Sequence, residues 1–369
     1  MMHLRRLKNI QFLNNLSNTS FYLRLFMKIS IGTNIKEGPW GGGNLFAINL
    51  KKYLEDKGHV VTNDLKDKDI DVILITEPRK TSESSAFTQI DVLKYLSFVK
   101  KDTIVVHRIN ECDERKGTNY VNKYLINANK VSDATVFVSS WIKKLYSNQG
   151  LNHRNASVIL SGANPEIFNK ENLNIWDGLE KLKIVTHHWG GNWNKGFDTY
   201  KKLDNLLNEN KWKDKFEFTY IGNLPKNFKF KNSHHISPLS GFTLASEIKK
   251  HHIYITGSIN EPSGNHHIEA AQCGLPLLYI NSGGIPEYCE GFGVQFELNN
   301  LEEKMDYLIN NYENLQEKIK NYPRSAEKMS SEYEKLFLNL YENKSNVVNS
   351  RKINLIDSKL SKFKYNLFN

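Results

Sequence analysis

Cysteine, proline and long apolar runs are all scarce in this sequence. It has 3 cysteines and 9 prolines in 369 residues, and Cys112, Cys273 and Cys289 form no Cys-x-x-Cys pair. We therefore do not expect a disulfide-stabilised scaffold or a zinc ribbon. The few scattered cysteines predict that the protein resides in a reducing compartment. No apolar run reaches the roughly 18 residues that a membrane-spanning helix needs, so we do not expect an integral membrane protein.

Acidic residues are fewer than basic ones, and the position of the excess is informative. The chain has 50 Lys+Arg against 40 Asp+Glu, a net charge of +10. Residues 1–26 carry +4 and residues 351–369 carry +4, which leaves +2 on the long middle part. A nucleic-acid-binding body would be more basic, so we expect no nucleic acid partner. The basic ends also contain Leu, Phe and Tyr, and they could give a weak peripheral contact with an anionic membrane or could be solvated tails.

From Met27 onward the pattern alternates between apolar strands and amphipathic helices. The strands are near-continuous apolar runs, such as residues 71–76, which are typical of a parallel sheet covered on both faces. Strands are predicted at 28–33, 59–63, 70–76, 103–107, 134–138, 157–160, 182–187, 216–221, 253–256, 276–280 and 293–296. Helices are predicted at 44–57, 87–99, 119–130, 140–148, 196–208, 242–250, 264–273 and 301–311, followed by a long helical stretch over 312–342.

The alternation stops in an Asn-rich segment around Pro165 and then starts again, which predicts two α/β domains of similar size. Two such domains facing each other form a cleft, a common place for a small-molecule site. The predicted organisation is a basic extension (1–26), an N-terminal Rossmann-like domain (27–168), a linker (169–181), a C-terminal Rossmann-like domain (182–330), a C-terminal helix (331–350) and a basic tail (351–369).

Two loops that follow predicted strands are suited to bind an anion. Gly41, Gly42 and Gly43 join the first strand to the first helix, where glycine lets the backbone approach a phosphate and the helix start supplies free N–H groups. The spacing is neither Gly-x-Gly-x-x-Gly nor a Walker loop, and a structural turn is the alternative. Lys195 stands just before Gly196 and a predicted helix, where it could neutralise a phosphate or be a solvated surface residue.

The most informative segment runs from Glu261 to Pro276. Glu261 and Glu269 are eight positions apart across a loop and a helix start, with Ser263 as the expected N-cap and Gly264, Asn265 and His266 offering free amides. Such a helix start stabilises an anion. Glu269, inside the helix, can accept hydrogen bonds from a diol such as ribose. A surface helix with incidental acids is the alternative. A second tight loop, residues 281–288, follows the next predicted strand.

Together these segments resemble the donor site of GT-B retaining glycosyltransferases, particularly family four. That signature is Glu-Pro-x-Gly, a second Glu after seven intervening residues, Ala-x-x-Cys-Gly-x-Pro and Gly-Gly-x-Pro-Glu, all of which stand between Glu261 and Glu287. Residues 58–60, 161–168 and 195–196 are similar to the same group. The resemblance covers about residues 27–340. It implies the GT-B fold, with the C-terminal helix crossing back to the first domain.

The resemblance also implies roles for individual residues. Glu269 would hold the ribose of a nucleotide diphosphate sugar, and Glu261 would contact the hydroxyls of the transferred sugar. Lys195 and the Gly41–Gly43 loop would hold the diphosphate, and Ser263, Gly264, Asn265 and His266 would line the donor site. His107, at the end of a strand, matches a position where the family often has a histidine in the cleft. A buried strand-end histidine is the alternative.

One departure from the family pattern concerns the diphosphate. The family usually has an Arg about five residues before the Lys, whereas this chain has Gly190 and Gly191 there. His187, His188 or Arg108 could substitute. We expect no metal and no cofactor beyond a UDP- or GDP-linked sugar as co-substrate. Asp67-Lys68-Asp69 has the spacing of a metal-binding motif, but it falls in a predicted surface turn.

The leading hypothesis is therefore a cytoplasmic, metal-independent retaining glycosyltransferase with an unidentified glycan, lipid-linked or small-molecule acceptor. A peripheral membrane location through the basic ends is the second option for its localisation. A sugar-nucleotide epimerase of similar fold is one alternative. A degenerate nucleotide-sugar-binding member without turnover is the other.

Overall fold

The computed structural model describes residues 26–36, 41–151, 155–351 and 353. The basic extension predicted for residues 1–26 and the basic tail predicted for 351–369 therefore lie outside the described residues, except for Phe26, Arg351 and Ile353.

The first domain is built on a parallel sheet of buried apolar strands. Its strand order is β2-β1-β3-β4-β5-β6 among the described residues. The strands are β1 (Lys28–Ile31), β2 (Val60–Thr62), β3 (Val72–Ile75), β4 (Ile104–Ile109), β5 (Ala134–Phe137) and β6 (Ala156–Val158). All four residues of β3 and all six of β4 are buried, as a sheet covered on both faces requires.

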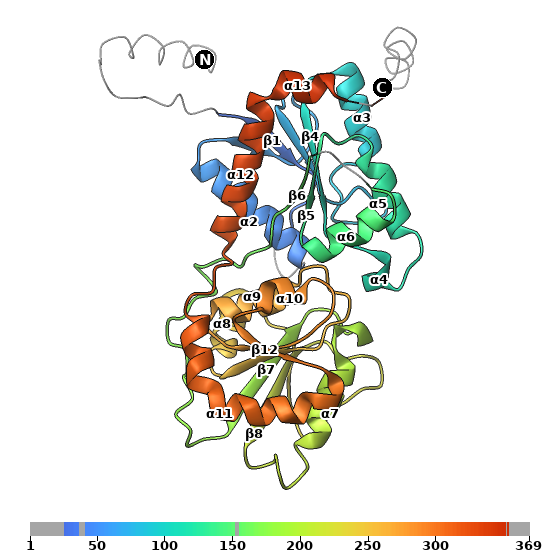
Figure 1. Ribbon diagram of the computed structural model, residues 1–369. Coiled ribbons are helices and arrows are strands. Elements are labelled where there is room, and N and C mark those ends of the chain that lie inside the picture. The colour runs from blue at the N-terminus through green and yellow to red at the C-terminus, as the bar shows by residue number, and fades with distance from the viewer. Residues whose placement is uncertain (1–25, 37–40, 152–154, 352, 354–369) are drawn as a thin grey trace, which may run out of the picture.

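Helices cover both faces of this first sheet (Figure 1). One face packs against α2 (Gly42–Asp56) and α12 (Ala326–Glu342), and the other against helices that include α3 (Gln89–Phe98), α5 (Val121–Asn129) and α6 (Ser140–Asn148). Two short helices, α4 (Asp113–Lys116) and α13 (Lys344–Asn349), complete the domain. Side chains alternate along β4, so Val106 faces α2 and α12 while Val105 faces the opposite layer.

The second domain repeats this plan with the parallel order β12-β11-β10-β7-β8-β9 in its described residues. The strands are β7 (Leu182–His188), β8 (Phe216–Gly222), β9 (His234–Ile236), β10 (Ile253–Thr256), β11 (Leu277–Ile280) and β12 (Gly293–Phe296). Strand β9 was not predicted from the sequence, because His234 and His235 are exposed at the sheet edge and give no apolar run. With this addition the predicted two-domain α/β architecture is confirmed.

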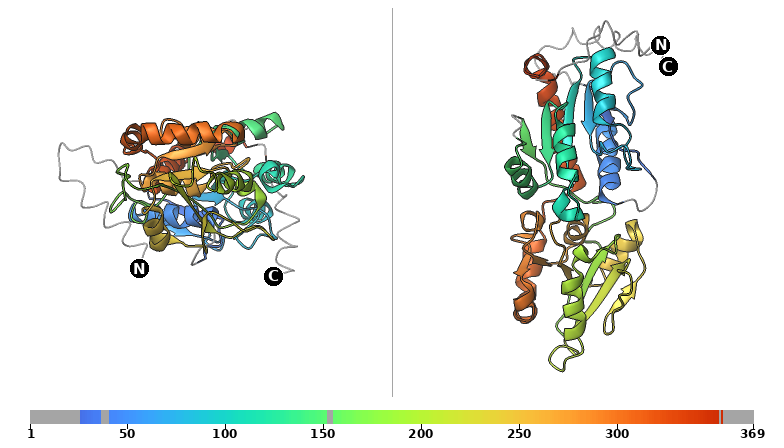
Figure 2. Two further views of the ribbon diagram at one scale, coloured as in Figure 1. Left: turned by 90° about the horizontal axis from the view of Figure 1, so that it is seen from below. Right: turned by 90° about the vertical axis from the view of Figure 1, so that its right-hand side faces the viewer.

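Two helical layers also enclose the second sheet, as Figures 1 and 2 show. One face packs against α8 (Gly241–Ile248), α9 (Asn265–Gln272) and α10 (Ile285–Cys289), and the other against α7 (Phe197–Leu206) and α11 (Leu301–Ile319). The starts of α9 and α10 therefore lie toward the first domain, where they can contribute to a site between the domains.

The chain crosses between the domains twice, and the two crossings run side by side (Figure 1). The N–H of Ala163 donates to Arg324 O at 3.4 Å, and that of Ala326 donates to Ala163 O at 2.7 Å. Phe168, placed by the sequence in the first domain, packs in the core of the second. The first crossing thus comes slightly earlier than the linker predicted at 169–181.

The long helical stretch predicted over 312–342 is interrupted in the structure. Helix α11 ends at Ile319, and α12 begins only at Ala326, capped by the Ser325 hydroxyl, which accepts from Lys328 N at 3.1 Å. Pro323 lies in the break and cannot donate a helical hydrogen bond. The helix that returns to the first domain, expected at 331–350, is α12 followed by α13, so the predicted crossing back is confirmed.

Arg351, which the sequence analysis counted in the basic tail, belongs to the first domain. Its guanidinium forms a two-pronged ion pair with Asp133, with Nε–Oδ1 and Nη2–Oδ2 both at 2.7 Å, and both side chains are buried. In the described part of the chain, none of the helices is both long and apolar enough to cross a membrane.

Candidate active site

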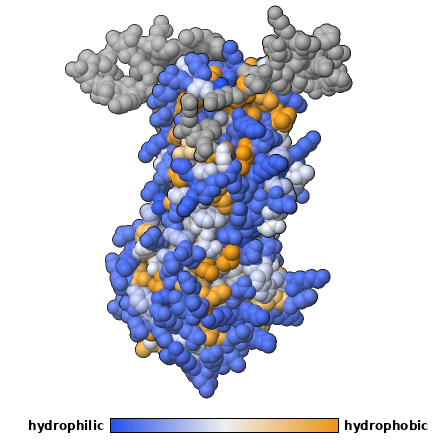
Figure 3. Space-filling model, turned by 45° about the vertical axis from the view of Figure 1, so that its right-hand side comes forward, coloured by the Kyte–Doolittle hydropathy of each residue, from blue (hydrophilic) through white to orange (hydrophobic). Residues whose placement is uncertain are grey.

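A cleft of about 660 Å³ lies between the two domains, at the carboxyl ends of both sheets. Open α/β sheets bind ligands at this edge. Figure 3 shows the waist between the domains on one face of the molecule, where apolar side chains reach the surface beside hydrophilic ones. Ten of the eleven predicted site residues line the cleft: Gly41, Gly42, Gly43, Lys195, Glu261, Ser263, Gly264, Asn265, His266 and Glu269.

Lys195 and Glu261 form an ion pair in this cleft. The distance from Lys195 Nζ to Glu261 Oε2 is 3.2 Å. Burial lowers the pKa of the Lys195 ammonium, and Glu261 partly offsets that effect. Burial alone would raise the pKa of Glu261, but the charges of Lys195 and Arg115 outweigh it and lower that pKa to about 2. Glu261 is therefore ionised at neutral pH and can accept hydrogen bonds from hydroxyl groups.

The Lys195 loop requires a glycine at its end. Lys195 closes a short 3-10 turn (Trp193–Lys195), and Gly196 follows with φ of 107°, in the left-handed region. A Cβ at Gly196 would lie 2.6 Å from the carbonyl carbon of Gly257. The close approach of these two backbones fixes Lys195 beside the segment that carries Glu261.

Arg115 completes this cluster, and the sequence analysis missed it. Its Nη2 lies 2.8 Å from Glu261 Oε2, although Arg115 belongs to α4 in the first domain. Its Nη1 donates to the carbonyl oxygens of Asn194 and Ile259 at 3.2 and 3.4 Å. Arg115 has no motif around it in the sequence, and only the facing of the two domains brings it to the site.

The start of α9 supplies unpaired backbone amides to the cleft. Its N-cap is Gly264, not the predicted Ser263, and no side chain of the described residues caps the helix. Gly264 has φ of 78°, and a Cβ there would lie 2.9 Å from Glu261 Cγ. From the other domain, Gly42 approaches so closely that its Cβ would lie 3.1 Å from the side chain of Asn265. Two helix N-terminal regions thus meet across the cleft, an arrangement that favours an anion.

Glu269 lies further along the cleft and is held by a histidine. Glu269 Oε2 is 2.8 Å from His187 Nε2, and both residues are buried. Tyr254 Oη lies 3.2 Å from His187 Nδ1 and fixes the ring on its other side. The lining of the cleft also includes apolar side chains, among them Ile221, Leu239 and Leu244. Such side chains can contact a flat ring system such as a nucleobase.

Two of the histidines that line the cleft, His188 and His266, are not cations. Burial, followed by the nearby charges, holds the pKa values of His188 and His266 well below the usual value. His266 Nε2 lies 2.8 Å from Thr256 Oγ1. His188 therefore does not supply the missing charge that the sequence analysis suggested. Arg108 lies at the wall of the cleft, with its guanidinium 4.0 Å from the ring centroid of Phe46.

The prediction that His107 faces the cleft was wrong. His107 is fully buried within β4, and its Nδ1 lies 3.1 Å from Nδ2 of Asn129 in α5. The alternation of side chains along the strand turns Arg108, not His107, toward the cleft. His107 is instead the buried strand-end histidine that the alternative interpretation described.

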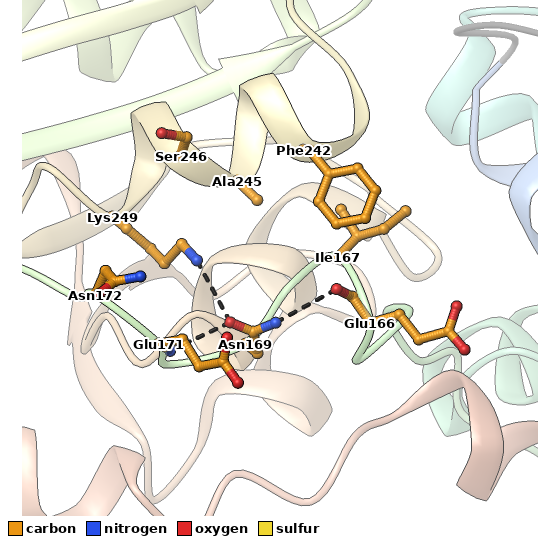
Figure 4. Close-up of a pocket in the computed structure, with 9 residues that line it drawn as sticks. All are labelled: Glu166, Ile167, Asn169, Glu171, Asn172, Phe242, Ala245, Ser246 and Lys249. Carbon is orange, nitrogen blue, oxygen red and sulfur yellow. Dashed lines mark hydrogen bonds between the residues drawn. The ribbon is translucent and has the colours of Figure 1, made fainter.

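A smaller hollow of about 340 Å³ lies beside α8, outside the main cleft. Figure 4 shows Asn169 at its centre, accepting from Lys249 Nζ at 3.4 Å and from the N–H of Glu171 at 3.2 Å. The polar groups of this hollow largely bind one another. The main cleft, with its buried charges and open helix starts, is the better candidate site.

The two facing parallel sheets, the returning α12 and the cleft between them define the GT-B fold of glycosyltransferases. Residues 193–326 match the family model of glycosyl transferases group 1. This segment contains Lys195, Glu261 and Glu269, so the match covers the second-domain side of the cleft. No curated protein sequence matches the chain significantly.

Solved structures similar to this chain share its fold at low sequence identity. A glycosyltransferase from Rickettsia africae has a TM-score of 0.63 at 15% identity, covering 86% of this chain and 99% of its own. The catalytic domain of starch synthase IV from Arabidopsis thaliana, bound to ADP and acarbose, has a TM-score of 0.62 at 12% identity, with coverage of 86% and 99%. HepE from Anabaena, in complex with UDP and glucose, has a TM-score of 0.58 at 13% identity, with coverage of 85% and 100%.

Proposed function

We propose that this protein transfers a sugar from a nucleotide diphosphate sugar to an acceptor, with retention of the anomeric configuration. The observation that carries the proposal is the arrangement along one cleft of Lys195 with Glu261, the start of α9, and Glu269 with His187. These groups fit the three parts of such a donor: Glu261 the sugar, Lys195 and the start of α9 the diphosphate, and Glu269 the ribose. The Glu-x7-Glu motif supports retention through its resemblance to family four.

In this proposal, stabilisation of the leaving diphosphate contributes most to catalysis. The bond from the anomeric carbon to the phosphate oxygen breaks, and the electron pair leaves with the diphosphate. Lys195 and the amides at the start of α9 neutralise that charge from fixed positions, as preorganised groups in an active site do. The acceptor oxygen attacks from the same face, and its proton passes to the leaving phosphate. Glu261 holds the sugar hydroxyls and is not a nucleophile.

We propose a UDP- or GDP-linked donor and no metal or further cofactor. Side-chain and backbone groups that can hold a diphosphate are present, which supports this choice. The acceptor, a glycan, lipid-linked or small molecule, would enter on the first-domain side, beside Asn110 and Glu111. We also propose a cytoplasmic location, with weak membrane contact through the basic ends.

A thermal-shift screen with UDP, GDP and ADP, followed by product analysis with the matching sugar donors, tests the function. We expect one nucleotide class to raise the melting temperature, and its sugar donor to release nucleotide only when an acceptor mixture is added. NMR of the product then reports the anomeric configuration. Free epimerised sugar nucleotide would instead support the epimerase, and binding without turnover would support the degenerate module.

A further inference from the structure

Two cationic side chains, Lys195 and Arg115, both pair with one carboxylate oxygen of Glu261, just before the start of α9. Lys195 Nζ and Arg115 Nη2 lie 3.2 and 2.8 Å from Glu261 Oε2. An ionised Glu261 cancels one of these two positive charges, so the three side chains together keep one. Lys195 and Glu261 without Arg115 would be neutral as a pair. A diphosphate would then find no net positive charge in this cluster.

Arg115 is positioned by its own domain before any ligand binds. The neighbouring Asp113 accepts hydrogen bonds from the backbone N–H groups of Tyr120, Val121 and Asn122 at 2.9 to 3.0 Å. These bonds fasten α4 to the start of α5. Gly117 then ends α4 in the left-handed conformation, with φ of 66°. The Arg115 side chain is 7% exposed and is thus held across the domain boundary.

The other cationic side chains that line the described part of the cleft contact groups outside the Lys195–Glu261 pair. Lys116 Nζ pairs with Glu111 at 2.8 Å, and the Arg108 guanidinium covers the ring of Phe46. Burial keeps the imidazoles of His188 and His266 neutral, as their lowered pKa values show. Arg115 is the remaining candidate beside Lys195.

Gly190 is a second position from which a long cationic side chain, such as an introduced arginine, could reach the same cluster. A Cβ at Gly190 would lie 3.8 Å from Lys195 Cε, an ordinary van der Waals contact, and Gly190 does not have a positive φ that a side chain would disfavour. The chain carries no side chain there. Among the described residues, Lys195 is therefore the cation that the second domain supplies to this cluster, and the first domain supplies the other cation, Arg115.

We propose that Arg115 is the second diphosphate-binding cation of this enzyme, supplied by the domain opposite the donor. This inference rests on the proposed function. When the donor binds, the diphosphate takes the place of Glu261 Oε2 between Arg115 and Lys195, and Glu261 turns to the sugar hydroxyls. As the bond to the sugar breaks, both cations stabilise the departing diphosphate. The leaving group is thus fully stabilised only when the two domains are closed together.

Calorimetric titration of full-length variants with UDP, GDP, ADP and the matching nucleosides tests this role. We expect Arg115→Met to weaken binding of the preferred nucleoside diphosphate about tenfold to a hundredfold. Binding of the nucleoside should stay within about twofold, because it lacks the phosphates. Arg115→Lys should retain part of the affinity, and adding Gly190→Arg to Arg115→Met should restore part of it. Lys123→Met, an exposed change on α5 of the same domain, serves as the control.

The outcomes separate the two proposals. Equal diphosphate affinity in the wild type and Arg115→Met would overturn the role of Arg115 and leave the proposed function standing. An equal loss for nucleoside and diphosphate, without recovery on adding Gly190→Arg, would mean that Arg115 only ties the domains together. A wild-type chain that binds none of the three nucleotides would overturn the proposed function, and this inference with it.

Discussion

At the scale of single residues, most of the predicted site residues line the cleft, because local sequence motifs specify them. Glu261, Glu269 and Lys195 stand within or beside glycines that shape their loops, and these short-range patterns can be read without a fold. Arg115 and His107 show the limit of this reading. Whether a side chain on β4 reaches the cleft depends on strand alternation, and whether one on the following helix α4 does so depends on how the two domains face each other.

Glu269 offers a direct test of nucleotide binding. We expect Glu269→Ala to weaken binding of the preferred nucleotide by about 1.5–3 kcal/mol, because it removes a charged acceptor for the ribose diol. It also removes the partner that holds His187 at 2.8 Å. Titration calorimetry measures the loss, with the exposed Glu303→Ala on α11 as a matched control. Unchanged affinity would contradict the ribose-binding role.

The buried histidines of the second domain predict a loss of stability in mild acid. Burial lowers the folded-state pKa values of His188, His266 and His267, the last to about 3. Below the unfolded value near 6.5, the unfolded chain binds protons that the folded one does not, so stability falls as pH drops. These three groups together remove about 4 kcal/mol between pH 7.5 and 5.5. His251 and His252, whose pKa values burial also lowers, the latter to about 4, add to the loss.

Urea denaturation at the two pH values measures this change. Replacing His267 by Asn should reduce the pH-dependent loss by about 1.4 kcal/mol, since one titrating group is gone. A free energy of unfolding that stays constant from pH 7.5 to 5.5 would show that these histidines can be protonated in the folded protein.

At the scale of elements, helix starts connect the two domains as well as forming the site. Glu287 in α10 accepts hydrogen bonds from the backbone N–H groups of Ser140 and Trp141 at 2.8 and 2.9 Å, so it caps α6 of the other domain. Tyr288 next to it accepts from Ser161 N at 3.0 Å. The Gly-Gly-x-Pro-Glu segment therefore acts at the domain boundary. The sequence showed a helix start there but not its partner.

Glu287→Ala is expected to destabilise the protein by about 1–2 kcal/mol, because two amides at the start of α6 lose their acceptor. Glu287→Gln should cost less, since an amide oxygen can still accept one bond. Chemical denaturation compares these variants with Glu290→Ala, an exposed change at the end of the same helix. Equal stability of Glu287→Ala and Glu290→Ala would mean that the cap across the domains is energetically unimportant.

At the scale of the whole molecule, the alternation of strands and helices was enough to predict two α/β domains, because buried parallel strands need long apolar runs. The alternation did not predict the residues at which the chain crosses between the domains. Pro323 breaks a helical pattern that looks continuous, and Phe168 joins the second core despite its position in sequence before the expected linker. Both depend on packing between distant segments.

The distribution of charge leads to the last prediction. Residues 1–25 contain four cations and no acid, and residues 354–369 contain three cations and one acid. Basic segments near an anionic bilayer contribute up to about 1 kcal/mol per cation, an effect that salt weakens. A chain limited to residues 26–353 should therefore bind phosphatidylserine vesicles at least tenfold more weakly at low salt, while its affinity for the preferred nucleotide stays unchanged. Vesicle co-sedimentation and calorimetry measure the two quantities. Equal sedimentation of the full and shortened chains would exclude membrane contact through the basic ends, and a parallel loss of nucleotide affinity would show instead that the ends support the cleft.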